Sequence, residues 1–354
     1  MVRQTIPEAT RQRLHATAAH LRALVQTGWT VEVTGCAREA GTLTISNDGD
    51  KGDLQVIPRM RLDPRGVPAL PDVDVPAVVA TPWISPRTRE LLTGRGVGYV
   101  DDTGNAFVEM TRPGLVIRTT GADHDPDPVP TPGPNLRGPR AWALLRTIAE
   151  VTPPYGVQQL ADAVRVDTGY VSRVLKVLAD ELLIERRPRG PVTSVDWEGV
   201  LRKLATTYSL FGSNETSTWV ASAGPGQLLD DLTSRRVGPW AVTGSFVPSA
   251  IAPVAAPEVA VIYTDDTERL AKAGRLLPAV AGANVVLAVP YDEIVFTRTR
   301  NVAKAPYVSV AQAAIDALSG PGRMPAEGDA LLDWMRRNPT RWQTSALTPP
   351  TGTD

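Results

Sequence analysis

A group of polar side chains between positions 168 and 176 has the spacing that exposes one face of a helix. They are Thr168, Tyr170, Ser172, Arg173 and Lys176. Such guanidinium, ammonium and hydroxyl groups donate hydrogen bonds to base edges and phosphates, and an arginine such as Arg173 can read guanine with two bonds. A second basic group follows at Arg186, Arg187 and Arg189. The chemistry that these residues offer is recognition of a nucleic acid.

Three short amphipathic helices and a hairpin are predicted to position these side chains. Apolar residues recur at spacing 0, 3, 4 and 7 over 141–148, 157–164 and 171–178, so the three stripes can bury one common core. Two strand-like runs follow at 183–187 and 192–195, joined by a turn at 188–190 that carries an arginine. This is the order of a winged helix–turn–helix, whose third helix enters the major groove while the wing reaches phosphates or the minor groove.

The stretch GVQQLADAVRVDTGYVSRVLKVLADELLIERRPRG resembles winged-helix regulators of the MarR and antitoxin type. The resemblance implies a DNA-binding module. The alternative is a winged helix that contacts only other proteins.

The distribution of charge favours the DNA-binding interpretation. The whole chain carries 37 basic and 38 acidic residues, a net charge of −1 that argues against a nucleic-acid partner. Residues 1–125 hold 14 basic and 15 acidic side chains, residues 137–203 hold 11 and 8, and residues 204–354 hold 12 and 14. The middle segment alone is basic, at +3, so we expect DNA affinity to require a dimer and to fall with salt.

A proline-rich run, DPDPVPTPGP at 125–134, is typical of an extended spacer. It divides the chain into an α/β domain over 1–124, a linker over 125–136, the winged helix over 137–203, a second α/β domain over 204–345 and a disordered tail over 346–354. In the first domain we expect helices over 8–26 and from Ser85, with seven short strands. In the last domain we expect strands near 219–221, 240–242, 259–263 and 284–289, and helices over 227–233, 267–276, 310–318 and 326–336.

The first domain, with TPWISPRTRELLTGRGVGYVDDTGNAFVEM, resembles the restriction-endonuclease-like domain of bacterial winged-helix proteins. A nuclease of that fold needs a carboxylate followed by an acidic-x-Lys motif to hold a metal ion. None of the five lysines has an acidic residue two positions before it, and Asp63-Pro64-Arg65 is the arginine-substituted version in this domain. We therefore expect an inactive domain. The polar group Tyr99, Asp101, Asp102 and Asn105 is either a site or a turn before a strand, and we favour the turn.

The last domain, with WAVTGSFVPSAIAPVAAPEVAVIYTDD and YVSVAQAAIDALSGPGRMPAEGDALLDWM, resembles the C-terminal domain of AbiEi-family antitoxins of type IV toxin–antitoxin systems. It also resembles, more weakly, a degenerate nucleotidyltransferase. Gly244-Ser245 matches the turn of such enzymes, but the strand that follows reads Glu258-Val259-Ala260 and lacks the second carboxylate that metal binding needs. One cysteine, Cys36, and three histidines offer no metal cluster. We expect no catalytic residue, metal or cofactor.

These observations predict a sequence-specific transcriptional regulator, acting as a repressor, that binds an inverted repeat of double-stranded DNA as a homodimer. The AbiEi resemblance implies an antitoxin with a cognate toxin as a partner. The absence of a membrane span or signal core predicts a cytoplasmic, nucleoid-associated protein. The alternative function is a DNA-targeted nuclease or nucleotidyltransferase that the winged helix guides.

Overall fold

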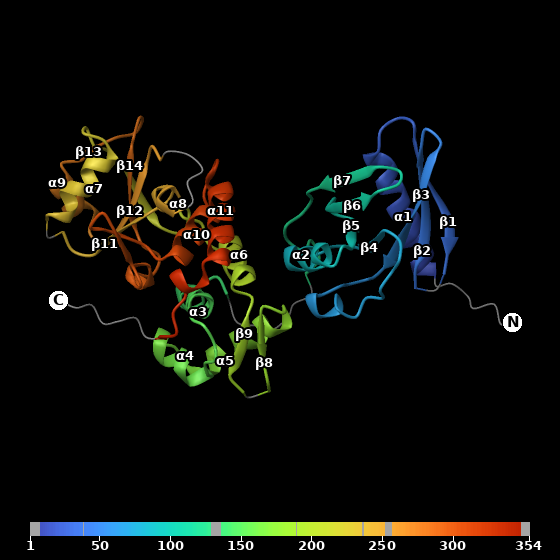
Figure 1. Ribbon diagram of the computed structural model, residues 1–354, viewed down its shortest axis with the longest axis horizontal. Helices are drawn as coiled ribbons and strands as arrows, with labels where there is room; N and C mark the ends of the chain where they lie inside the picture. The colour runs from blue at the N-terminus through green and yellow to red at the C-terminus, as the bar shows by residue number, and fades with distance from the viewer. Residues whose placement is uncertain are drawn as a thin grey trace. The chain divides into compact units, whose positions relative to one another are not determined.

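The computed structural model describes residues 8–37, 39–128, 136–188, 190–235, 237–251 and 257–347. The chain forms two compact units, Met1–Pro132 and Gly133–Asp354, and each unit contains both helices and sheet (Figure 1). The expected mixed α/β class is therefore confirmed. Among the described residues, no helix has the length and apolar character that crossing a bilayer requires.

The first unit is built on a seven-stranded sheet whose strands lie in chain order. These strands are β1 (Trp29–Cys36), β2 (Gly41–Asn47), β3 (Asp50–Pro58), β4 (Ala77–Thr81), β5 (Gly98–Asp101), β6 (Ala106–Met110) and β7 (Leu115–Thr119). β4 runs parallel to both β3 and β5, and the other neighbouring strands pair antiparallel. All seven strands coincide with the seven strand-like runs of the sequence.

Helices cover both faces of this sheet. Successive side chains of β4 point to opposite faces, so neighbouring residues of this strand belong to two different cores. Val78 joins the core under α1 (Glu8–Leu24), which buries Leu14 and Leu21. Its neighbour Val79 joins the core under η1 (Pro64–Gly66) and α2 (Pro86–Gly94). The α2 helix begins where the sequence predicts, since the Ser85 hydroxyl caps it and proline occupies the first turn.

The second unit contains another seven-stranded sheet, in the order β13-β10-β14-β12-β11-β16-β15. Its strands are β10 (Glu215–Val220), β11 (Trp240–Thr243), β12 (Ala260–Thr264), β13 (Leu277–Pro278), β14 (Val285–Val289), β15 (Arg300–Val302) and β16 (Ala305–Tyr307). Its helices are α7 (Pro225–Thr233), α8 (Phe246–Ile251), α9 (Thr267–Gly274), α10 (Val310–Leu318) and α11 (Met324–Arg337), with the 3-10 turns η2 (Glu293–Phe296) and η3 (Pro339–Arg341). In Figure 1, α7 and α9 lie on one side of this sheet, and α10 and α11 lie on the other.

The same unit begins with three helices and a hairpin, as the sequence indicates. They are α3 (Pro139–Glu150), α4 (Val157–Val164) and α5 (Thr168–Asp180), then β8 (Ile184–Arg186) and β9 (Val192–Val195), followed by α6 (Trp197–Thr207). The helices α3, α6 and α10 pack against one another, and one apolar core runs from Trp142 on α3 to Met335 on α11. The segments that we expected as two domains therefore share one compact unit.

Some elements differ from expectation for identifiable reasons. β10 begins at Glu215, earlier than the apolar residues indicate, because much of the strand is exposed and its first residues are polar. The short α8, β15 and β16 hold too few residues for an apolar period to be visible. In the expected linker, residues 129–135 lie outside the described part. Of the expected tail, Ala346 and Leu347 are described, and their carbonyls accept hydrogen bonds from Arg298.

Candidate nucleic-acid interface

The α5 helix presents the predicted polar group on its outer face. Its inner stripe, Val171, Val174, Leu175 and Leu178, is buried. Four of the predicted residues are exposed: Thr168, Ser172, Arg173 and Lys176. The fifth, Tyr170, is half-buried and packs against the core of the unit. The Asp167 carboxylate caps the helix by accepting from the Tyr170 amide at 2.7 Å, which fixes where the outer face begins.

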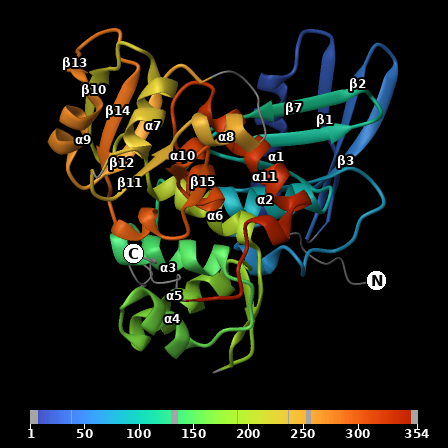
Figure 2. The ribbon, with the colours of Figure 1, turned by 60° about the vertical axis from the view of Figure 1, so that its left-hand side comes forward.

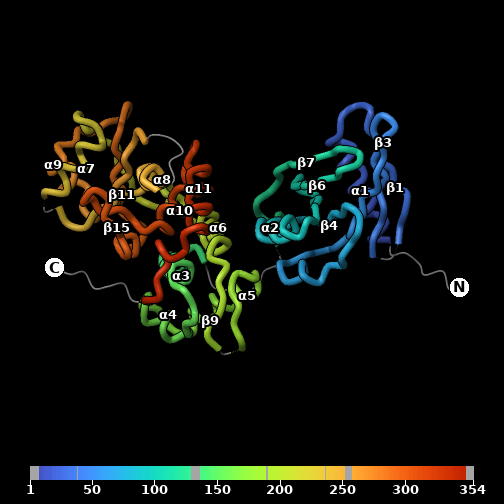
Figure 3. The backbone as a smooth tube through the Cα atoms, viewed as in Figure 1, coloured from blue at the N-terminus to red at the C-terminus, as the bar shows by residue number. Residues whose placement is uncertain are grey.

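The hairpin β8–β9 packs beside α5 (Figure 3). Its strands pair antiparallel, with Ile184 opposite Val195 and Arg186 opposite Val192. Arg186 is half-exposed at the end of β8, and Arg187 is exposed in the connection that follows. Arg189, the third predicted arginine, lies outside the described residues. The structure therefore brings two of the three hairpin arginines to the element that neighbours α5.

The cations of this surface have no carboxylate partner within the described part of the chain. Arg173, Lys176, Arg186 and Arg187 form no ion pair there. Basic residues on α6 behave differently: Lys203 contacts Glu181 at 2.7 Å, and Arg202 contacts both Glu198 and Asp329. Cations without internal partners retain their full charge for an external anion.

Arg140, on the first turn of α3, belongs to the same electrostatic environment but was missed in the sequence. Burial raises the pKa of the Tyr170 hydroxyl, and the positive charges of Arg140 and Arg173 partly oppose that rise. Both guanidinium groups therefore act on one hydroxyl. Arg140 is exposed and immediately precedes the first apolar stripe. This position at the start of a predicted helix was the one feature of the sequence that could have pointed to it. Figure 2 shows α4 next to both α3 and α5.

The Gly244-Ser245 turn is occupied by an internal contact. Gly244 has a positive φ of 65°, and the Ser245 hydroxyl donates to Glu327 Oε2 at 2.6 Å. The Glu327 carboxylate is buried and also accepts from Arg323 Nε at 3.0 Å. These bonds anchor the turn before α8 to α11, which is a structural use of the serine.

The polar group of the first unit forms a hydrogen-bonded turn. The Asp101 carboxylate is buried and accepts from the amides of Ile84, Thr103 and Asn105. The buried side-chain oxygen Oδ1 of Asn105 accepts from Arg89 Nη1 at 2.6 Å. Asp102 and Tyr99 take no part in that bonding: Asp102 pairs with Arg13, and the Tyr99 ring packs near Phe107. This geometry agrees with the favoured turn.

Asp63 and Cys36 also occupy ordinary structural positions. Asp63 caps η1 by accepting from the Gly66 amide at 3.0 Å. Cys36 is a half-buried free thiol at the end of β1. Among the described residues, no group of three or more histidine, cysteine or acidic side chains is arranged to hold a metal ion.

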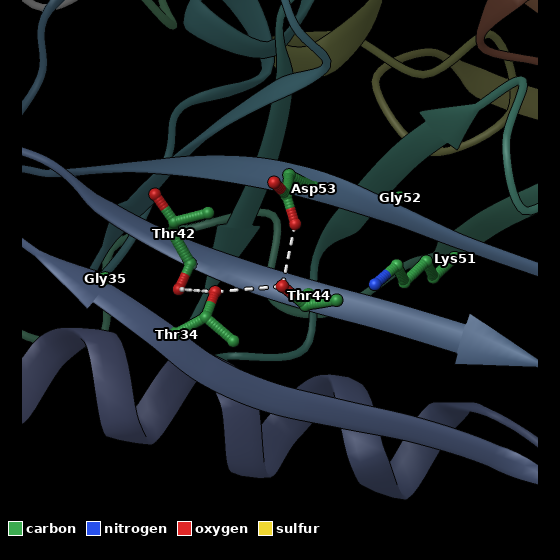
Figure 4. Close-up of a pocket in the computed structure, with 7 residues that line it drawn as sticks. All are labelled: Thr34, Gly35, Thr42, Thr44, Lys51, Gly52 and Asp53. Atoms are coloured by element: carbon green, nitrogen blue, oxygen red, sulfur yellow. Dashed lines mark hydrogen bonds between the residues drawn. The ribbon is translucent and has the colours of Figure 1, made fainter.

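An open polar hollow of about 490 Å³ lies on β1–β3, and no residue pattern predicted it. Figure 4 shows its lining: Thr34, Gly35, Thr42, Thr44, Lys51, Gly52 and Asp53. The Thr44 hydroxyl donates to Asp53 at 2.7 Å and contacts the Thr34 hydroxyl at 2.9 Å. A single carboxylate that is already hydrogen-bonded is a poor ligand set for a divalent metal ion.

Comparison with known proteins identifies similarity in the middle of the chain. A family model described as HVO_A0114 matches residues 138–200, from the N-cap of α3 into the first turn of α6. The chain matches no curated protein and no solved structure.

Proposed function

We propose that this chain is a sequence-specific DNA-binding transcriptional regulator that uses residues 137–203 as a winged helix–turn–helix. In this proposal α5 is the recognition helix and enters the major groove, and the hairpin β8–β9 is the wing that contacts the backbone. The protein acts as a repressor and binds as a homodimer to an inverted repeat, which places it in the cytoplasm, with the nucleoid.

One observation carries the proposal: the exposed face of α5 and the adjacent hairpin present cations without carboxylate partners in the described chain. Arg173 and Lys176 lie on the helix, and Arg186 and Arg187 lie on the hairpin. A surface of this kind binds polyanions, and the helix places its polar side chains in the order that base reading requires.

The flanking folds serve, in this proposal, as binding and assembly elements without catalysis. The internal bonds of Ser245, Asp63 and Asp101 support this assignment, because each of these groups already has a structural partner. The AbiEi resemblance of residues 204–345 extends the proposal to an antitoxin that represses its own operon and binds a cognate toxin.

A titration with duplexes selected from a randomised pool tests the function. The full chain should bind a selected duplex much more tightly than a scrambled duplex of equal length. Replacing Arg173 with alanine should weaken the selected complex by about 1–3 kcal/mol, as expected for a base-reading arginine. Arg337→Ala, which removes an exposed arginine of α11, is the matched control. Failure to enrich any sequence, or equal affinity for both duplexes, would contradict sequence-specific binding.

A further inference from the structure

The strand β7 lies at one edge of the first sheet, and part of its backbone faces outward. It pairs with β6 and with no other strand of the described chain (Figure 1). The Asn105 carbonyl accepts from the Asp101 amide of β5, so alternation along β6 and β7 turns the amides and carbonyls of Val116 and Arg118 away from β6. Among the described residues, these groups form no backbone bond with another element.

The other edges of the two large sheets have features that hinder pairing with a further strand. β1 has a bulge between Val33 and Gly35. β13 has two residues, one of which is Pro278, and β15 has three. β7 has five residues, no proline and no register shift, and it presents an apolar side chain, since Val116 is 67% exposed. Among these four edges, β7 is therefore the one best suited to accept another strand.

The sequence of β7 fits a second copy of the same strand. In an antiparallel pair with a twofold axis at Ile117, Val116 lies opposite Arg118 of the partner subunit, and these two residues exchange both backbone hydrogen bonds. The axis repeats the exchange at Arg118, so every outward group of both residues gains a partner. On the opposite face of the sheet, Leu115 and Ile117 belong to the core under α1, and this pairing extends that core across the axis.

Charge complementarity favours the same register. Glu109 on β6 and Arg118 on β7 are exposed on one face of the sheet, and within the described residues Glu109 has no cation partner. Arg118 lies over the Phe107 ring of its own subunit, 5.1 Å from the centroid. The twofold pairing places Arg118 of the partner subunit two strand spacings, about 10 Å, from the Glu109 backbone. The two long side chains can span that distance, so opposite charges face each other across the axis.

We propose that two copies of this chain associate along β7 and join their first sheets into one continuous sheet. The interface deepens the proposed function, and its role in DNA binding rests on that function, which requires a homodimer on an inverted repeat. It assigns dimerisation to the first unit and leaves base reading to α5.

Analytical ultracentrifugation of the full chain without DNA, over a concentration series, tests the interface. Wild-type protein should sediment as a dimer. Val116→Lys places an ammonium beside Arg118 of the partner subunit on both sides of the axis and should raise the dissociation constant about tenfold. Thr30→Lys adds the same charge at an exposed residue of β1, the other edge of the sheet, and should leave the constant unchanged. Because both residues are exposed, both variants should keep the wild-type melting temperature.

A charge exchange tests the register of the two strands. Arg118→Glu brings carboxylates toward each other across the axis and should weaken the dimer. Adding Glu109→Arg to that variant should restore the wild-type dissociation constant. A double variant that remains as weak as Arg118→Glu alone would overturn the antiparallel pairing at Ile117.

The interface and the proposed function fail separately. If wild-type protein is monomeric throughout the series, or if Val116→Lys dimerises as tightly as wild type, the β7 interface is wrong, while enrichment of a duplex would still support DNA recognition. If the dimer depends on Val116 but no duplex is enriched, the interface stands and the proposed function is wrong.

Discussion

Asp316 on α10 is a fully buried carboxyl, and its replacement by asparagine should remove the contribution of this group to the pH dependence of stability. It accepts hydrogen bonds from Thr243 at 2.5 Å, Gln312 at 2.8 Å, Tyr263 at 3.0 Å and Tyr208 at 3.1 Å. Burial raises the pKa of this carboxyl to about 6 from 3.8, and these bonds only partly oppose the rise. All four donors are neutral groups, so no direct hydrogen-bond partner among them neutralises the ionised form.

The sign of the effect follows from that elevated pKa. A carboxyl that binds its proton more tightly in the folded state stabilises the fold fully below pH 3.8, and the contribution is lost as the pH rises through about 6. A shift of about two pKa units corresponds to about 3 kcal/mol. Asparagine has the same shape without the charge, and the Thr243 hydroxyl can rotate to accept from its amide. Relative to wild type, Asp316→Asn should therefore gain about 2 kcal/mol between pH 4 and pH 7, because part of the full difference is already lost at pH 4.

Urea unfolding followed by tryptophan fluorescence measures this difference, since six of the eight tryptophans lie in the second unit. The free energy of unfolding of the variant minus that of wild type should increase with pH. A matched control, Asp333→Asn, changes a carboxyl that is 60% exposed and should show no such trend. If the Asp316→Asn difference is the same at both pH values, the buried carboxyl is not elevated and the reasoning is refuted.

Two further substitutions test the cores. Glu150→Gln should destabilise the second unit by about 3–5 kcal/mol, because the buried Glu150 carboxylate bonds both Arg146 and Arg298 at 3.0 Å. Urea unfolding measures this loss of stability. As a control, Glu198→Gln changes a half-exposed carboxylate and should lower the free energy of unfolding by only about 0–1 kcal/mol. Equal losses would contradict the burial argument. Leu14→Ala should destabilise the first unit by about 2–5 kcal/mol, because Leu14 lies on the inner face of α1 and is fully buried in the core of that unit. Calorimetry should show this in one transition only, and equal shifts in two transitions would be inconsistent with separate cores.

Local patterns predicted most elements because each depends on neighbouring residues. The Ser85-Pro86 start of α2 follows from capping chemistry, and the stripe of α5 follows from helical period. The surroundings of α3 could not be read in this way. The helix is buried from Ala141 to Glu150, although its stripe occupies one face. Trp142, Ala143 and Ala149, the apolar residues off that stripe, were the only local sign that a second layer covers it.

Polar contacts between residues far apart in the chain could not be predicted from local sequence patterns. The Arg146 guanidinium is buried and donates to the Thr297 carbonyl at 3.0 Å and to the Ser309 hydroxyl at 3.1 Å. These partners lie far along the chain, so no local window contains them. The exposed face of α5 was predictable for the opposite reason, since exposure follows from the stripe that is buried. The effect of Arg140 on Tyr170 could not be predicted from the sequence, because it depends on how the fold brings the start of α3 toward α5.

The continuous core of the second unit also determines how the chain can exchange parts during evolution. A recombination junction within residues 129–135, between the two units, leaves every apolar cluster complete. A junction near residue 203 would divide the cluster that joins Trp142 to Leu204 and Ile315. Exchange of the three helices and hairpin alone would therefore expose apolar residues of the sheet and helices behind them, and under the proposed function a change of DNA sequence requires only substitutions on the outer face of α5.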